Sequence, residues 1–240
     1  MPGIKKSACI LYYLAENQTF YMKILLILAC FTPFVFTSCV KECTCTPPPT
    51  QKTITSQPGP TDGNDAYTSY LASDPSWANG TNTLPEITTV TWTNGGAISK
   101  SRGYVSFNLD EIPSGAHIDS ARLYIYGISS SVNAPQGNSG DNRLYIQRVL
   151  SSWSENTITW NNAPATSEEN QVTTPATTTT WNADINVSVT SMVQDMINEN
   201  KRYGFSLKLI NDVPYASIVL GSSETTDPTK RPKLVVTYTK

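Results

Sequence analysis

Apolar and polar residues alternate along much of the chain beyond residue 62, and this period of two is typical of β-strands with one buried face. The pattern is clearest in residues 101–110 and 116–128, which flank a turn at 111–115. We expect these two stretches to pair as one antiparallel hairpin on which the rest of the domain packs. Further strands are predicted at residues 66–71, 86–92, 142–150, 157–160, 181–187, 203–209 and 234–238. Residues 74–80 lie in a predicted loop, and 94–96 form a turn.

One segment, residues 190–199, has the helical period instead. Four apolar residues fall on one face of this predicted helix, namely Met192, Val193, Met196 and Ile197. Thr190 or Ser191 is expected to cap its first turn. About ten short strands with a single helix predict an all-β fold, an antiparallel β-sandwich of jelly-roll type.

The N-terminal part has the features of a bacterial lipoprotein signal. Met22 and Lys23 precede the apolar run 24–36, and small residues lead up to Cys39. We expect residues 1–38 to be an upstream extension plus signal peptide, and Cys39 to be the lipidated first residue of the mature chain. Plain secretion and a retained membrane span are the alternatives, although the run is shorter than the ~20 apolar residues that a span needs. The predicted location is the outer membrane or cell surface, with the lipid as membrane anchor.

Cysteine use and proline content define a tether at residues 39–61. All five cysteines lie within the first 45 residues, so the domain has no disulfide and no cysteine metal ligand. Cys43 and Cys45 are interpreted as incidental residues of the tether, and not as a metal or redox pair. Because proline fixes φ and removes an amide donor, the proline-rich residues 46–61 predict a semi-extended spacer before a domain at 62–240.

Charge and residue content argue against several function classes. The formal net charge of −2 is too near neutral to support binding of nucleic acid through bulk electrostatics. His117 is the only histidine and is expected at the surface, and no Gly-x-Ser-x-Gly motif or domain cysteine offers a nucleophile. The paired carboxylates fall at predicted turns. We therefore predict no enzyme and no cofactor, and a structural calcium is left open because no ligand spacing marks one.

Six segments resemble a known family in the right order. They are residues 101–109, 112–116, 120–126, 152–164, 189–193 and 232–238, and the most specific is Ser-Trp-Ser-Glu-Asn-Thr-Ile-Thr-Trp-Asn-Asn-Ala-Pro at 152–164. They are similar to the DNRLRE domain family of bacterial and archaeal surface proteins. Some members are carbohydrate-binding modules that recognise alginate, so the resemblance implies a non-catalytic jelly roll that binds a glycan. Other members are repeats of large surface proteins without an assigned ligand.

An aromatic and basic row on the predicted hairpin is the expected binding site. Tyrosine rings stack on sugar rings, and arginine or lysine pairs with uronate carboxylates. The candidate residues are Lys100, Arg102, Tyr104, Arg122, Tyr124 and Tyr126, with Trp77 and Trp92 as second candidates. Trp153 and Trp160 are expected in the core, and the basic residues 230–233 are interpreted as a solvated guard of a sheet edge.

The sequence thus predicts a surface lipoprotein whose domain binds a polysaccharide, such as the uronate alginate. A structural or adhesive surface domain without a glycan ligand is the alternative, and a polysaccharide-cleaving enzyme is less favoured.

Overall fold

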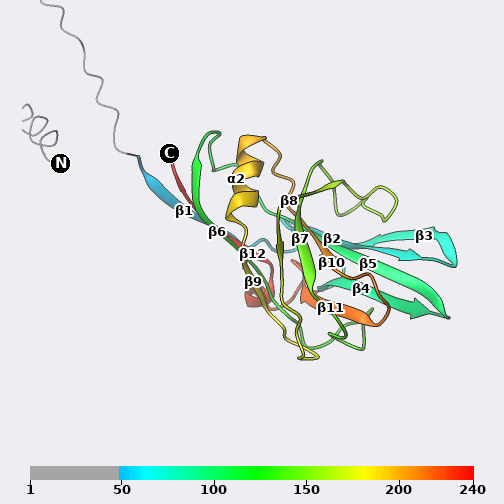
Figure 1. The fold of residues 1–240 in the computed structure, drawn as a ribbon. Coiled ribbons are helices and arrows are strands. Elements are labelled where there is room, and N and C mark those ends of the chain that lie inside the picture. The colour runs from blue at the N-terminus through cyan, green and yellow to red at the C-terminus, as the bar shows by residue number, and fades with distance from the viewer. Residues whose placement is uncertain (1–48) are drawn as a thin grey trace, which may run out of the picture. The chain divides into compact units, whose positions relative to one another are not determined.

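The computed structural model describes residues 49–240, except the side chain of Ala78 (Figure 1). The predicted signal and the calls on Cys39, Cys43 and Cys45 lie outside the described residues. The helices of the described part are too short or too polar to cross a membrane.

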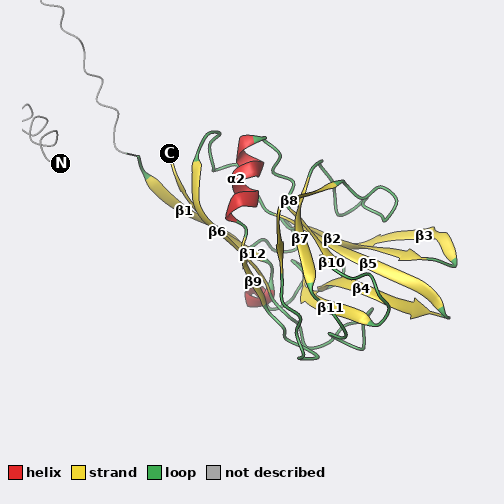
Figure 2. Cartoon of the chain, viewed as in Figure 1, coloured by secondary structure: helices red, strands yellow, loops and turns green. Residues whose placement is uncertain are grey.

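Strands dominate the described residues, as Figure 2 shows. They are β1 (Gln51–Ser56), β2 (Asn64–Leu71), β3 (Asp74–Thr81), β4 (Glu86–Asn94), β5 (Ala97–Ser106), β6 (His117–Ile125), β7 (Leu144–Val149), β8 (Thr166–Thr173), β9 (Ile185–Ser188), β10 (Phe205–Leu209), β11 (Ala216–Gly221) and β12 (Lys233–Thr239). The helices are α2 (Thr190–Asn198) and the short 3-10 turn η1 (Pro228–Lys230).

The strands form two antiparallel sheets with the hydrophobic core between them. The small sheet has the order β1-β12-β6-β9. The large sheet has the order β11-β4-β5-β10-β7-β8, and β2 pairs with both β5 and β3. Val105 and Leu207 of the large sheet share one buried cluster with Leu123 and Leu234 of the small sheet. The predicted all-β sandwich is therefore confirmed.

The predicted hairpin of residues 101–110 and 116–128 is wrong. Both stretches are strands, but β5 pairs with β2, β4 and β10, whereas β6 pairs with β12 and β9 in the other sheet. The ten-residue connection 107–116 buries Phe107, Leu109 and Ile112 in the core. Because these apolar residues fill the space between the sheets, the connection crosses from one sheet to the other and does not close a turn.

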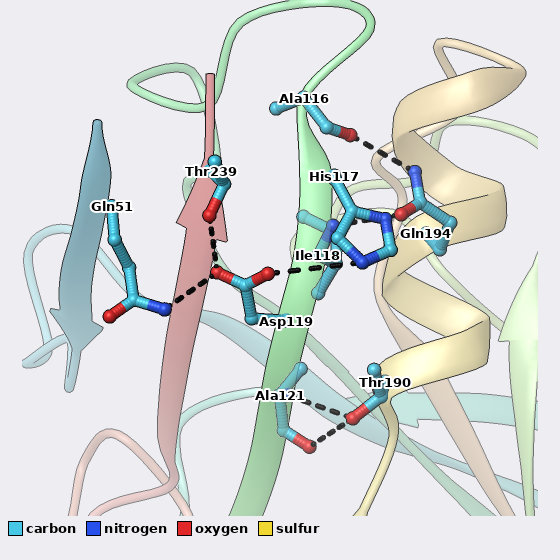
Figure 3. A network of polar contacts seen from close by, with 9 residues as sticks. All are labelled: Gln51, Ala116, His117, Ile118, Asp119, Ala121, Thr190, Gln194 and Thr239. Atoms are coloured by element: carbon cyan, nitrogen blue, oxygen red, sulfur yellow. Dashed lines mark hydrogen bonds and ion pairs between the residues drawn. The ribbon is translucent and has the colours of Figure 1, made fainter. Parts of the chain in front are cut away.

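Part of the predicted spacer is a strand of the domain. β1 pairs with β12 from Gln51 opposite Thr239 to Ser56 opposite Leu234. Asp119 of β6 links β1 and β12, as Figure 3 shows: its Oδ2 accepts hydrogen bonds from Gln51 Nε2 (2.9 Å) and Thr239 Oγ1 (2.7 Å). The spacer interpretation is therefore wrong for residues 51–56.

The helix is confirmed, but its predicted cap is not. α2 buries the four predicted apolar residues, and no side chain caps its start. The Thr190 hydroxyl instead accepts a hydrogen bond from the Ala121 amide of β6 (2.9 Å), and Gln194 bonds the Ile118 amide (2.8 Å; Figure 3). Polar side chains of α2 thus fasten the helix to the small sheet.

Two local predictions also fail. Residues 74–80, expected in a loop, belong to β3 at the outer side of β2, and residues 157–160, expected as a strand, lie in a loop. His117 is exposed at the start of β6, as expected.

Candidate functional site

The structure distributes the predicted site residues over three separate places. Arg102 and Tyr104 line a cleft on one face of the large sheet. Trp77, Trp92 and Lys100 line a second cleft. The remaining three, Arg122, Tyr124 and Tyr126, lie together on or just beyond β6 of the small sheet. We call these places the cationic cleft, the tryptophan cleft and the tyrosine face.

The cationic cleft, about 230 Å³, is built by cross-strand neighbours. Arg102 of β5 lies opposite Thr68 of β2, and Tyr104 lies opposite Ser206 of β10. Ser206 in turn lies opposite Gln147 of β7. Because directly opposed residues share a face of the sheet, these five side chains line one surface.

A loop segment forms the other wall of the cationic cleft and covers Tyr104. The Trp153 ring lies 5.7 Å from the Tyr104 ring, and its Nε1 donates to the Tyr203 carbonyl (2.9 Å). Tyr104 is consequently 2% exposed, and its burial raises the pKa of its hydroxyl. Tyr104 lies on the face of β5 opposite Val105, as predicted. The expectation that its ring is exposed there to a ligand is wrong.

Trp160, expected in the core, is half-buried and lines the cationic cleft. The Cζ atom of Arg102 lies 4.5 Å from the Trp160 ring centroid, which is a cation–π contact. The Tyr70 ring packs against the same indole at 5.4 Å and 29°. Arginine and indole therefore form one combined wall of aromatic and cationic character.

Positive charge predominates at the cationic cleft. Arg102 and Lys208 line it, and no aspartate or glutamate of the described chain is among its lining residues. Arg102 has an acidic partner in Asp212, whose Oδ2 lies 3.8 Å from Arg102 Nη2 and 3.0 Å from Lys100 Nζ. Arg102 and Lys208 therefore leave a local positive charge at this cleft, on a chain whose net charge is −2.

Lys208 and Gln147 were missed from the sequence. In β10, Phe205 and Leu207 are buried in the core, so strand alternation places Ser206 and Lys208 on the opposite face. The alternation of β10 could therefore have identified Lys208 as a residue of the outer face. Gln147 could not be assigned in the same way, because β7 is buried on both faces.

The tryptophan cleft is larger, about 480 Å³, and lies between the ends of β2, β3, β4 and β5 and the loop 132–136. The Trp92 ring packs edge-on against Tyr215 at 5.0 Å and 88°. Trp77, on β3, is 38% exposed. Both second candidates are therefore at one site.

The tyrosine face is covered by lysine side chains. The rings of Tyr124 and Tyr126 lie 6.5 Å apart and nearly parallel, and Lys233 Nζ lies over both, 4.6 and 5.6 Å from their centroids. Lys233 belongs to β12, which lies between β1 and β6. The interpretation of residues 230–233 as guards of a sheet edge is therefore wrong, because this strand is not an edge.

Three acidic residues, Asp65, Glu155 and Glu224, lie near one another outside the two clefts. Asp65 is 1% exposed, and burial, with Glu224 nearby, raises its pKa to about 7. Burial also raises the pKa of Glu155, whose Oε2 accepts from the Asp65 amide (3.1 Å). None of these three lines either cleft. Within residues 49–240, no group of three or more histidine, cysteine, aspartate or glutamate side chains is arranged to hold a metal ion.

A β-sandwich with open clefts lined by aromatic, amide and cationic side chains defines a binding module. The model of carbohydrate-binding module family 96 matches residues 61–238, well over half of the chain. The chain therefore belongs to that family of carbohydrate-binding modules. No curated protein matches the chain.

Proposed function

We propose that the domain binds an acidic polysaccharide, a uronate such as alginate, in the cationic cleft and does so without catalysis. The observation that carries this proposal is that two cations, Arg102 and Lys208, line one cleft, and that no carboxylate of the described residues lines it. A uronate chain repeats one carboxylate per sugar unit, so it supplies the charge that this cleft lacks.

The chemistry of each lining group suits an acidic sugar. The guanidinium of Arg102 is planar and can donate two parallel hydrogen bonds to a carboxylate. The Trp160 ring fixes that guanidinium in place, which reduces the entropy lost on binding. The Gln147 amide can donate to one sugar hydroxyl and accept from another.

Affinity electrophoresis through gels that contain alginate or polygalacturonate tests the proposal. The wild-type domain should be retarded, and Arg102→Ala should bind at least tenfold more weakly, because a charge-assisted hydrogen bond contributes about 1.5–3 kcal/mol. Arg102→Lys keeps the charge without the two parallel donors and should fall between the two. Equal retardation of the wild type and Arg102→Ala in both acidic gels would contradict the proposal.

The absence of catalysis has a separate test. The purified domain, incubated with the same polysaccharides, should release no new reducing ends and no unsaturated products. Release of either would assign a cleavage reaction in place of simple binding.

We also propose that the domain is displayed on the cell surface through a lipid on Cys39. The positive segment, apolar run and small residues before this cysteine support the proposal. Cys39→Ser should move the protein from the membrane fraction to the soluble fraction, and an unchanged membrane fraction would overturn the assignment.

A further inference from the structure

The lining of the tryptophan cleft has the chemistry of a site for a neutral sugar. Asn79, Asn94 and Gln136 supply amides, and Ser99 and Thr93 supply hydroxyls. Such groups both donate and accept hydrogen bonds, as sugar hydroxyls do. Lys100 is the single charged residue of the lining within residues 49–240, and it is already paired with Asp212 at 3.0 Å.

A buried carboxylate fixes one wall of the tryptophan cleft. Glu86, 3% exposed, accepts hydrogen bonds from the backbone amides of Val132 (3.1 Å) and Asn133 (3.2 Å). The Asn133 side-chain amide donates to Glu86 (3.2 Å) and to the Tyr67 hydroxyl (2.6 Å). Both amide protons of Asn133 are thus used within the protein, so its carbonyl oxygen is the group available to a ligand hydroxyl.

Two indole rings give the tryptophan cleft its apolar surface. Trp92 of β4 lies opposite Ser99 of β5, so the two side chains share a face, and Tyr215 supports the ring at its edge. Trp77 comes from β3, which among the described strands pairs with β2 alone. A cavity of about 480 Å³ with aromatic walls and fixed polar groups is within the range of small-ligand sites.

The two clefts lie on opposite faces of β2 and β5. Thr68 and Arg102, which are directly opposed, line the cationic cleft. Their neighbours Ser69 and Ser101, also directly opposed, line the tryptophan cleft. Because successive side chains of a strand point to opposite faces, a molecule in one cleft does not occupy the other.

We propose that the tryptophan cleft is a second saccharide site, which takes a neutral, hydroxyl-rich chain while the cationic cleft takes an acidic one. The domain would then hold two glycan chains at once, one on each face of β2 and β5. The neutral site does not depend on the acidic site proposed above.

Affinity electrophoresis with neutral probes tests the second site. The probes are guar galactomannan, konjac glucomannan, hydroxyethyl cellulose and laminarin, each in its own gel. At least one should retard the wild-type domain, and Trp77→Ala should weaken that binding about tenfold or more, because an aromatic anchor dominates the energy of such a contact. Trp77→Phe keeps an aromatic ring and should retain most of the binding.

Arg122→Ala, on the tyrosine face, is the matched control and should be retarded like the wild type. Trp77 is partly exposed on an outer strand, and the thermal midpoint of Trp77→Ala will show that the variant is folded. No retardation in any of the four gels, or equal retardation of Trp77→Ala and the wild type, would overturn the second site.

A saturation experiment tests simultaneous binding. Excess of the neutral probe that binds should change the affinity for alginate by less than about twofold. Competition between the two polysaccharides would show a shared site and overturn two-site binding. If alginate does not bind at all, the acidic proposal fails, and the neutral gels still decide the tryptophan cleft.

Discussion

β5 and β6 have the same alternating pattern, yet their polar faces have different fates. On β5, Tyr104 is buried beneath Trp153, and Arg102 borders a hollow. On β6, Arg122 stays exposed, and Tyr124 is half-buried under a lysine. The period of two determines which side chains share a face, whereas segments distant in the sequence decide whether that face is covered or open.

The largest expected effect concerns Asp65, which lies opposite Val105 of β5. Its raised pKa of about 7 means that the folded state binds a proton that the unfolded state releases near pH 4. Stability should therefore fall as pH rises from about 4 to 7 and stay level above. Asp65→Asn removes this cost and should stabilise the domain by on the order of 4 kcal/mol at pH 8, with little gain at pH 4, in urea unfolding.

Asp119 of β6 is the matched control, because its environment acts in the opposite direction. Hydrogen bonds from Gln51 and Thr239 lower its pKa (Figure 3). Its contribution is present above the unfolded pKa and is lost as pH falls through the folded one. Asp119→Asn should therefore lower the thermal midpoint at neutral pH and lose that effect in acid. If the stability change caused by Asp65→Asn and that caused by Asp119→Asn vary with pH in the same direction, the opposite environments inferred for the two carboxyl groups are wrong.

Trp153→Ala removes the cover of β5 and should cost about 2–3 kcal/mol, somewhat less than a fully buried tryptophan. The variant loses the contact with Tyr104 and the hydrogen bond to the Tyr203 carbonyl. Tyr124→Ala on β6 should cost less than about 1 kcal/mol, because this side chain is only half-buried. Urea unfolding measures the free energy of unfolding of both variants. Equal decreases would show that the packing of Trp153 over β5 adds no more stability than the exposed face of β6 does.

The fold could be predicted from the sequence because period-two alternation reports burial directly. Strands such as β10 and β12, and the apolar face of α2, follow from local pattern alone. The sheet partner of β6 does not, because residues 107–116 look like a hairpin turn until their side chains are seen in the core. β3 was missed because its sequence, Asp-Pro-Ser-Trp-Ala-Asn-Gly-Thr, contains the residues of turns, and only pairing with β2 makes it a strand.

The candidate site could be predicted only in its parts. Arg102 and Trp92 were chosen for their chemistry, and each lines a cleft. The sequence alone does not assign Arg102 and Trp92 to different clefts. Whether a residue of β5 and a residue of β4 lie on the same face of the sheet depends on how the two strands pair. The place of Trp160 at the cleft could not be predicted, because its contact with Arg102 joins residues 58 positions apart.

Lys208→Ala should weaken alginate binding about fivefold, close to 1 kcal/mol, which is less than the loss for Arg102→Ala. A lysine acts as a point charge on a flexible stem and fixes the carboxylate less firmly than arginine does. Added salt should reduce the difference between variant and wild type. Lys233→Ala in the small sheet is the matched control, and a loss equal to that of Lys208→Ala would show that bulk charge, and not the cleft, holds the ligand.

The smallest effect is expected for Arg122→Ala combined with Tyr124→Ala, which removes an aromatic and a basic residue from β6. Tyr124 is already covered by Lys233, 4.6 Å from its ring centroid, and Arg122 Nε donates to Asn186 Oδ1 (2.9 Å). Both groups are therefore occupied within the protein, and alginate affinity in the gel assay should change by less than about twofold. A tenfold loss in a variant that unfolds like the wild type would move the acidic site from the cleft over β5 to the tyrosine face.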